Sequence, residues 1–128
     1  MSELNSANDS IVWRDIPVAD LDRAIAFYRA VLAIGVDRME FDRMSFAILE
    51  HDQGNGSCLI PHARYTCYVD GLLVYMNVDW RIRDAVDKVG KLGNKLREAI
   101  HPIGLHGIRA ITLDSERNRI ALHSTVDA

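Results

Sequence analysis

Hydrophobic residues in the first part of the chain change from strand spacing to helix spacing. The stretch "IVWRDIPV" (11–18) reads as a strand that ends at Pro17, and Asp20 is suited to cap a helix after it. Apolar positions then recur every three or four residues up to Gly35, which is expected to break the helix. The apolar positions of this predicted helix are Leu21, Ala24, Ile25, Tyr28 and Val31.

Three short strands are predicted after this helix. "VDRMEF" (36–41) and "MSFAILEH" (44–51) flank a turn at Asp42 and Arg43. The turn "QGNG" (53–56) leads into "SCLIP" (57–61), which Pro61 closes. The first half of the chain therefore predicts the order strand, helix, strand, strand, strand.

The same order begins again after the segment 62–71. "LLVYMNV" (72–78) reads as a strand, Asp79 as a helix cap, and Gly93 as the end of the helix. The apolar positions of this second helix are Ile82, Ala85, Val86, Val89 and Leu92. Three further strands are predicted from "KLREAI" (95–100), "GIRAITLD" (107–114) and "NRIALHS" (118–124).

The two halves align as an internal repeat with a period of about 60 residues. Matching segments are Ile16-Pro17-Val18 with Met76-Asn77-Val78, Ala47-Ile48 with Ala110-Ile111, and "GNGSCLI" with "RNRIALH". We expect an α+β fold of two βαβββ modules, rather than a generic α+β domain with accidental regularity. Residues 1–10 form a flexible arm in this interpretation. Residues 11–124 form one domain of module 1 (11–61), linker (62–71) and module 2 (72–124).

Composition and charge narrow the class of protein. Apolar residues make up 48% and charged residues 26% of the 128 residues, which is typical of a globular domain. The net charge of −3 and the lack of a Lys/Arg block argue against nucleic-acid binding. The sequence shows neither a signal peptide nor a membrane span. Cys58 and Cys67 form no CxxC motif, so we expect reduced thiols in a cytoplasmic protein.

Strand alternation divides the side chains between a helix-covered face and an opposite face. Val12, Ile16, Val18, Val74, Met76, Val78, Ile120 and Leu122 are expected beneath the helices. The opposite face then carries Trp13, Asp15, Cys58, Ile60, Leu73, Tyr75, Asn77, Ala121 and His123. This mixture of aromatic and polar groups suits a small-molecule pocket, or a sheet face buried against a partner subunit.

Three segments resemble the vicinal oxygen chelate superfamily, which includes glyoxalase I, bleomycin-resistance proteins and extradiol dioxygenases. They are "DIPVADLDRAIAFYRAVL" (15–32), "GLLVYMNVD" (71–79) and "IGLHGIRAITLDSERNRIALHS" (103–124). The last two are similar to a bacterial branch of glyoxalase-related proteins, and the resemblance covers roughly residues 11–124. The chain departs from this branch at Arg117, where Gly is usual, and at "LGNKL" (92–96).

The resemblance implies curved mixed sheets around a cleft that holds one divalent metal in the enzymes of the superfamily. Each module supplies one ligand from its first strand and one from its last, and these positions are Trp13, Cys58, Leu73 and Ala121 in this chain. Only Cys58 can bind a metal, so we predict no cofactor and no metal at the usual site. A divalent metal held by unusual ligands stays open as a disfavoured alternative, the loop residues His51, His62, His101 and His106 being the candidates.

These residues support two functional hypotheses. In the first, a small, partly aromatic or amphipathic molecule binds on Trp13, Ile60, Leu73, Tyr75 and Ala121, and is oriented by Asp15, Asn77 and His123. The alternative is a glyoxalase-like enzyme, of lyase, isomerase or dioxygenase type, that uses His123 with or without a metal. Cys58 could serve it as a nucleophile with His123 as base, or be an inert buried thiol.

Two expectations concern the surface. Sheets built from short modules leave edges and apolar faces uncovered, so we expect a homodimer, and no nucleic-acid or membrane partner. The charged segment "SERNR" (115–119) is expected to be solvated.

Overall fold

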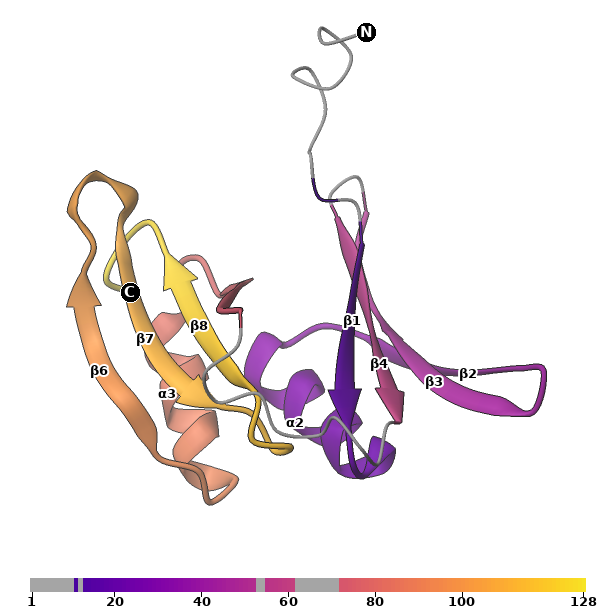
Figure 1. The fold of residues 1–128 in the computed structure, drawn as a ribbon. Helices are drawn as coiled ribbons and strands as arrows, with labels where there is room; N and C mark the ends of the chain where they lie inside the picture. The colour runs from indigo at the N-terminus through magenta and orange to yellow at the C-terminus, as the bar shows by residue number, and fades with distance from the viewer. Residues whose placement is uncertain (1–10, 12, 53–54, 62–71) are drawn as a thin grey trace, which may run out of the picture.

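Each half of the chain forms a four-stranded mixed sheet with one helix packed on one face (Figure 1). The structure is a computed structural model that describes residues 11, 13–52, 55–61 and 72–128. The predicted arm (1–10) and linker (62–71) therefore lie outside the described residues, as do Val12, His62 and Cys67. Among the described helices, none is both long and apolar enough to cross a membrane.

The element order is the predicted one. The first module consists of β1 (Trp13–Val18), α2 (Leu21–Leu32), β2 (Val36–Phe41), β3 (Met44–Leu49) and β4 (Gly56–Pro61). The second consists of β5 (Val74–Asn77), α3 (Ile82–Lys91), β6 (Leu96–Pro102), β7 (Ile108–Leu113) and β8 (Arg119–Ser124), with a 3₁₀ turn, η1 (Gly104–His106), between β6 and β7. The sheets have the orders β1-β4-β3-β2 and β5-β8-β7-β6, which confirms the α+β fold of two βαβββ modules.

Strand pairing confirms the internal alignment of the two modules. Ile16 lies opposite Leu59 in the parallel pair β1–β4, as Met76 lies opposite Leu122 in the parallel pair β5–β8. Ala47 and Ala110 face these two leucines from the next strand of each sheet. Equivalent sequence positions therefore occupy equivalent places in the two sheets.

Helix α2 begins as the sequence predicts and ends earlier than predicted. The carboxylate of Asp20 accepts a hydrogen bond from the backbone N–H of Arg23 at 3.1 Å, which satisfies one of the unpaired N–H groups of the first turn. The helix ends at Leu32, and Ala33, not Gly35, ends it in the left-handed conformation (φ 55°). Gly35 lies beyond the helix and donates its N–H to Glu50 Oε1.

The prediction that Asp79 caps α3 is wrong. Arg81 occupies the N-cap position without a capping side-chain bond. The Asp79 carboxylate instead accepts hydrogen bonds from the backbone N–H and hydroxyl of Thr125, at 2.7 and 2.6 Å, and from the Ser124 hydroxyl. These bonds lower the pKa of Asp79 and attach the segment after β8 to the start of α3.

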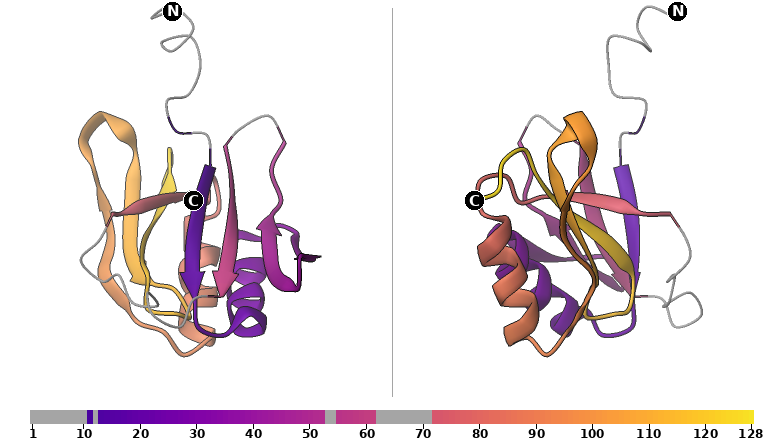
Figure 2. Two further views of the ribbon diagram at one scale, coloured as in Figure 1. Left: turned by 45° about the vertical axis from the view of Figure 1, so that its right-hand side comes forward. Right: turned by 90° about the vertical axis from the view of Figure 1, so that its left-hand side faces the viewer.

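The two helices pack against each other as well as against their own sheets, as Figures 1 and 2 show. The helix-facing side chains of both modules form a single buried cluster that includes Val18, Tyr28, Val78, Ile82 and Leu122. Arg81 Nη1 reinforces the contact by donating to the carbonyl of Val31, near the end of α2. The face of each sheet opposite its helix is called the open face below.

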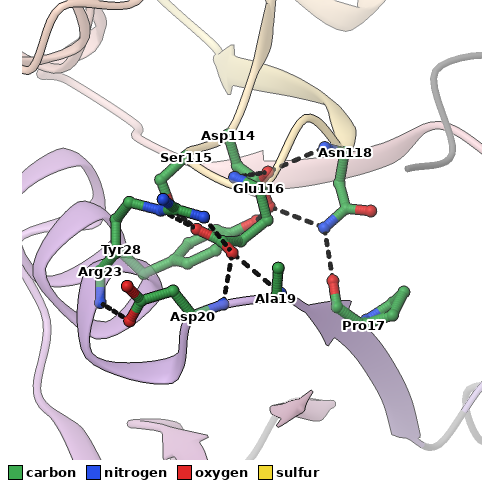
Figure 3. A network of polar contacts seen from close by, with 9 residues as sticks. All are labelled: Pro17, Ala19, Asp20, Arg23, Tyr28, Asp114, Ser115, Glu116 and Asn118. Carbon is green, nitrogen blue, oxygen red and sulfur yellow. Dashed lines mark hydrogen bonds and ion pairs between the residues drawn. The ribbon is translucent and has the colours of Figure 1, made fainter. Parts of the chain in front are cut away.

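In the turn between β7 and β8, Glu116 and Asn118 are buried, Ser115 and Arg119 are half-buried and Arg117 is exposed. The prediction of a solvated "SERNR" segment is therefore wrong for all but Arg117. Glu116 is only 3% exposed, and its carboxylate lies at the N-terminus of α2 (Figure 3). It accepts hydrogen bonds from the backbone N–H groups of Ala19 and Asp20, both at 2.8 Å, and from two nitrogens of Arg23 at 2.7 and 3.0 Å. A carboxylate is stabilised there by the free N–H groups and by the helix dipole.

Asp114 and Asn118 complete this intermodule network. The Asp114 carboxylate accepts the buried hydroxyl of Tyr28 at 2.6 Å and three N–H groups of Glu116 and Asn118. Asn118 Nδ2 also donates to the carbonyl of Pro17 at 2.8 Å, so the turn bonds to β1 as well as to α2. Arg117 adopts φ 70°, a left-handed conformation that favours glycine, which is the residue usual here in the similar branch.

Glu116→Gln should lower the free energy of unfolding by about 1–3 kcal/mol at pH 7, because a neutral amide replaces a carboxylate that accepts charge-assisted hydrogen bonds. Urea unfolding followed by circular dichroism measures this loss. The matched control is Glu40→Gln, since Glu40 is exposed and bonds only to Ser45 among its described contacts. We expect the control to change stability by less than about 0.5 kcal/mol.

The cost of Glu116→Gln should depend on pH. Burial raises the pKa of Glu116, but the hydrogen bonds from Arg23 and from the backbone at the N-terminus of α2 outweigh it and hold the pKa below its ordinary value of 4.5. Its contribution is therefore complete above pH 4.5 and is lost as the pH falls through the lower folded pKa. Burial raises the pKa of Asp114, so the effect of Asp114 on stability as the pH falls has the opposite sign. Because Asp114 is present in both the wild type and Glu116→Gln, the difference between these two proteins at each pH isolates Glu116. A cost that stayed constant down to pH 3 would contradict this assignment.

Candidate functional site

The predicted site residues lie on the open faces of two separate sheets. Trp13, Asp15, Cys58 and Ile60 belong to β1 and β4 of the first sheet. Tyr75, Asn77, Ala121 and His123 belong to β5 and β8 of the second, and Leu73 directly precedes β5. Ala121 is fully buried opposite Tyr75, and Asn77 Oδ1 accepts the backbone N–H of Asp79.

Trp13 lies edge-on to His51, the residue that follows Glu50 after β3. Their ring centroids are 5.8 Å apart, and the Trp13 side chain is 42% exposed. Gly56 permits this arrangement, since a Cβ there would come within 2.5 Å of the Trp13 ring and 2.7 Å of the His51 ring. Trp13 and His51 therefore form an aromatic edge to the open face of the first sheet.

Cys58 is paired with Asp15 across the parallel strands β1 and β4. Its thiol donates a hydrogen bond to Asp15 Oδ1 at 3.1 Å, and the residue is 5% exposed. Burial, reinforced by Asp15, raises the pKa of the thiol to about 11, so it is protonated at neutral pH. The contacts described for Cys58 thus bring it to Asp15 and not to His123, and they disfavour the predicted nucleophile.

His123 is held in one orientation on the open face of the second sheet. Its Nε2 lies 2.6 Å from the backbone carbonyl oxygen of His106, and since a carbonyl only accepts, Nε2 carries the hydrogen. In the neutral ring the basic nitrogen is therefore Nδ1. The Tyr75 ring lies edge-on to the imidazole, with centroids 6.2 Å apart.

Arg109 is a site residue that the sequence reasoning missed. It lies opposite His123 in the β7–β8 pair, donates from Nε to His101 Nε2 at 3.1 Å, and donates from Nη1 to the Tyr75 hydroxyl. A usable signal existed in the sequence: Ala110 aligns with the buried Ala47, so its neighbour Arg109 must lie on the open face.

Two cavities lie near these residues. The larger, of about 730 Å³, lies between the modules, with apolar walls of Ile16, Ile60, Val74 and Ile120 and polar groups from Arg14, Asp15 and Asn118. The smaller, of about 540 Å³, lies on the open face of the second sheet and is lined by Tyr75, Ile103, His106, Arg109 and His123. Of the predicted wall residues, Asp15 and Ile60 line the first cavity and Tyr75 and His123 line the second.

The four positions that hold the metal in enzymes of the resembled superfamily do not suit a metal here. Trp13, Leu73 and Ala121 have no ligating atom, and the Cys58 thiol is protonated and bonded to Asp15. Among the described residues, no group of three or more His, Cys, Asp or Glu side chains is arranged to hold a metal ion. His101 uses both ring nitrogens within the protein, Nδ1 toward the Ala99 carbonyl and Nε2 toward Arg109.

Comparison with solved structures places this chain in a known fold. A glyoxylase/bleomycin resistance protein/dioxygenase domain from Frankia sp. EAN1pec matches with a TM-score of 0.73, 17% identity, and coverage of 91% of this chain and 92% of that one. The fosfomycin resistance protein FosX of Listeria monocytogenes (TM-score 0.67, 12% identity, coverage 91% and 93%) is also similar. So is lactoylglutathione lyase of Agrobacterium tumefaciens (0.65, 14%, 91% and 94%).

The chain therefore has the glyoxalase/bleomycin resistance protein/dioxygenase fold, and the resemblance to the vicinal oxygen chelate superfamily is confirmed at the level of the fold. No family model matches the sequence, and no curated protein matches it. Identities this low establish the shared architecture, and the activities of the similar proteins remain theirs.

Alkylation should distinguish an inert Cys58 from a nucleophilic one. In a Cys67→Ser background, a thiol pKa of about 11 leaves about one thousandth of Cys58 as thiolate at pH 8, so iodoacetamide should react slowly and faster with each pH unit up to 10. Mass spectrometry measures the rate. Asp15→Asn should speed the reaction, because it removes the carboxylate that favours the protonated thiol. Rapid labelling that levelled off near pH 8 would show instead that Cys58 is activated.

Proposed function

We propose that this chain is a cytoplasmic protein that binds a small, amphipathic or partly aromatic molecule between its two modules, without the four-ligand metal site of the metal-dependent enzymes. One observation carries the proposal: the cavity of about 730 Å³ whose walls come from β1, β4, β5 and β8. Cavities of roughly 300–1,000 Å³ with apolar walls and few polar groups are typical of small-molecule sites.

The polar groups of this cavity suggest what kind of ligand it accepts. Arg14 lines the cavity, and its buried Nε has no hydrogen-bond partner among the described residues. Burial of an unsatisfied donor is costly, so a ligand with an acceptor group would gain by bonding to it. Ile16, Ile60, Val74 and Ile120 would cover the apolar part of the molecule. The roles predicted for Trp13, Leu73, Asn77 and Ala121 stay predictions, since they line neither cavity.

A second candidate is a glyoxalase-like enzyme that uses His123 as a general base. The observation in its favour is the bond from Nε2 to the His106 carbonyl, which fixes the ring and assigns Nδ1 as the basic nitrogen. His123 lies in the smaller cavity, which has no lining residue in common with the larger one. A reaction at His123 would therefore need a substrate on the open face of the second sheet.

The open face of the first sheet supports the proposal of a homodimer. Met39, Phe41 and Met44 lie together there, and Phe41, which pairs with Met44, is 74% exposed. These three side chains form an apolar surface of the kind that marks an interface in a folded protein. A second copy of the chain is the partner we propose for this surface, because closed symmetric dimers are the commonest assembly.

A ligand screen tests the binding proposal. Thermal unfolding is measured with phenylalkyl carboxylates, matched phenylalkyl amines and the corresponding neutral alcohols, because a ligand of the folded state raises the melting temperature. Ile60→Trp should fill part of the cavity and abolish the shift, and Met39→Trp, which adds the same ring outside the cavity, should leave it unchanged.

Each outcome of the screen has a defined meaning. A shift that survives Ile60→Trp would contradict binding in the intermodule cavity. Chemical conversion of a bound compound, lost in His123→Ala while the protein stays folded, would favour the enzyme. Stoichiometric metal in the purified protein, with conversion that depends on it, would contradict the metal-free proposal.

Light scattering tests the dimer. The double variant Phe41→Lys, Met44→Lys places two charges on the apolar surface and should convert a dimer into a monomer at micromolar concentration. Leu92→Lys is the matched control, since Leu92 is a 45% exposed apolar residue beyond the end of α3. A wild-type protein that is already monomeric, or a double variant that stays dimeric, would rule out this interface.

A further inference from the structure

The smaller cavity, on the open face of the second sheet, has a chemistry of its own. Its lining residues are Tyr75, Ile103, His106, Arg109 and His123, and it shares none of them with the intermodule cavity. We propose that this cavity is a separate binding site for a small oxyanion, a carboxylate or phosphoryl group on a small molecule, with Arg109 and Tyr75 as the groups that hold it. The inference does not depend on ligand binding between the modules.

Arg109 is fixed in position before any ligand arrives. Its Nε donates to His101 Nε2 at 3.1 Å, its Nη1 donates to the Tyr75 hydroxyl, and its side chain is 23% exposed. His101 accepts from Arg109 because its other nitrogen, Nδ1, faces the Ala99 carbonyl at 2.8 Å and must carry the hydrogen. A guanidinium held in this way loses little side-chain entropy when an anion binds.

Hydrogen-bond accounting leaves donors unused at this site. A guanidinium has five N–H groups, of which the hydrogen bonds to His101 and Tyr75 use two, and Nη2 also lies 3.9 Å from Glu98 Oε1 in an ion pair too long for a hydrogen bond. The Tyr75 hydroxyl accepts from Arg109, so its own hydrogen is left for a further acceptor. The unused N–H groups of Arg109 and the Tyr75 O–H are donors suited to the oxygens of a carboxylate or phosphoryl group, since a guanidinium can bond to two oxygens of either.

The charges around the cavity favour an anion over a cation. Arg109 is the charged residue of the lining, and Glu98, which forms an ion pair with it at 3.9 Å, does not line the cavity. His123 keeps Nε2 on the His106 carbonyl, so its Nδ1 would donate to an anion only as imidazolium. Ile103 supplies an apolar wall for the body of the ligand, so the site suits an oxyanion attached to a small carbon skeleton.

The competing explanation is that Arg109 only braces the sheet, through its cross-strand contacts to Glu98, His101 and Tyr75. To separate the two, the protein is titrated with inorganic phosphate and, in a second arm, with benzoate. Two-dimensional NMR follows the Arg109 Nε–H signal and the amide signals of β7 and β8. The phosphate arm reports affinity for a phosphoryl group, and the benzoate arm reports affinity for a carboxylate on a ring.

We expect at least one of these anions to shift the signals around Arg109 in a saturable way. Arg109→Gln should then raise its dissociation constant about 10- to 100-fold, the loss expected for a charge-assisted pair. Tyr75→Phe, at a half-exposed position, should raise the constant several-fold while the protein stays folded. Arg97→Gln, an exposed arginine on the neighbouring strand β6, should change the constant by less than about twofold.

Three results would overturn the inference. One is the absence of a saturable shift with either anion at millimolar concentration. The second is an equal loss of affinity in Arg97→Gln and Arg109→Gln, which would indicate a diffuse effect of net charge. The third is unchanged affinity in Arg109→Gln. Ile60→Trp, which alters only the intermodule cavity, should leave anion binding intact, so the two proposals succeed or fail separately.

Discussion

The carboxylate of Glu116 at the N-terminus of α2 is the interaction on which the arrangement of the two modules depends. The backbone N–H groups at the start of a helix have no partner within the helix. Here the N–H groups of Ala19 and Asp20 donate to Glu116, which belongs to the other module. The same turn holds Tyr28 through Asp114 and the end of β1 through Asn118. Asn118 and the neighbouring strand β8 also form one side of the larger cavity, so the contact that joins the modules also shapes the candidate ligand site.

The open faces of the two sheets have diverged within one shared architecture. Equivalent positions of the repeat hold Asp15 in β1 and Tyr75 in β5, and Cys58 in β4 and Ala121 in β8. In the first sheet, Cys58 and Asp15 form a thiol–carboxylate hydrogen bond in a region edged by exposed apolar side chains. In the second sheet, the open face carries a cluster of Arg109, His101 and His123. The open faces of the two sheets therefore present chemically different surfaces.

The candidate site residues line two cavities, so the single cleft that the resemblance implies predicts their arrangement only in part. Parity along each strand correctly places Trp13, Asp15 and Tyr75 away from the helices, because alternation follows from the extended backbone alone. It does not tell which of these side chains share a cavity. Asp15 and Ile60 face the space between the modules, and Tyr75 and His123 face the second sheet's own cavity, because cavity shape depends on how the modules are packed.

The sequence by itself determined the element order, the alignment of the two modules, the cap at Asp20 and the turn at Asp42 and Arg43, where both residues have positive φ. These are local properties, set by spacing, capping and strand alternation. The tertiary structure alone decided the burial of Glu116, the role of Asp79 and the partners of Arg109. Glu116 lies 97 residues from Ala19 and Asp79 lies 46 from Thr125, so only the packing of the modules brings these groups together. A charged side chain looks solvated in sequence until its partner, far along the chain, is placed beside it.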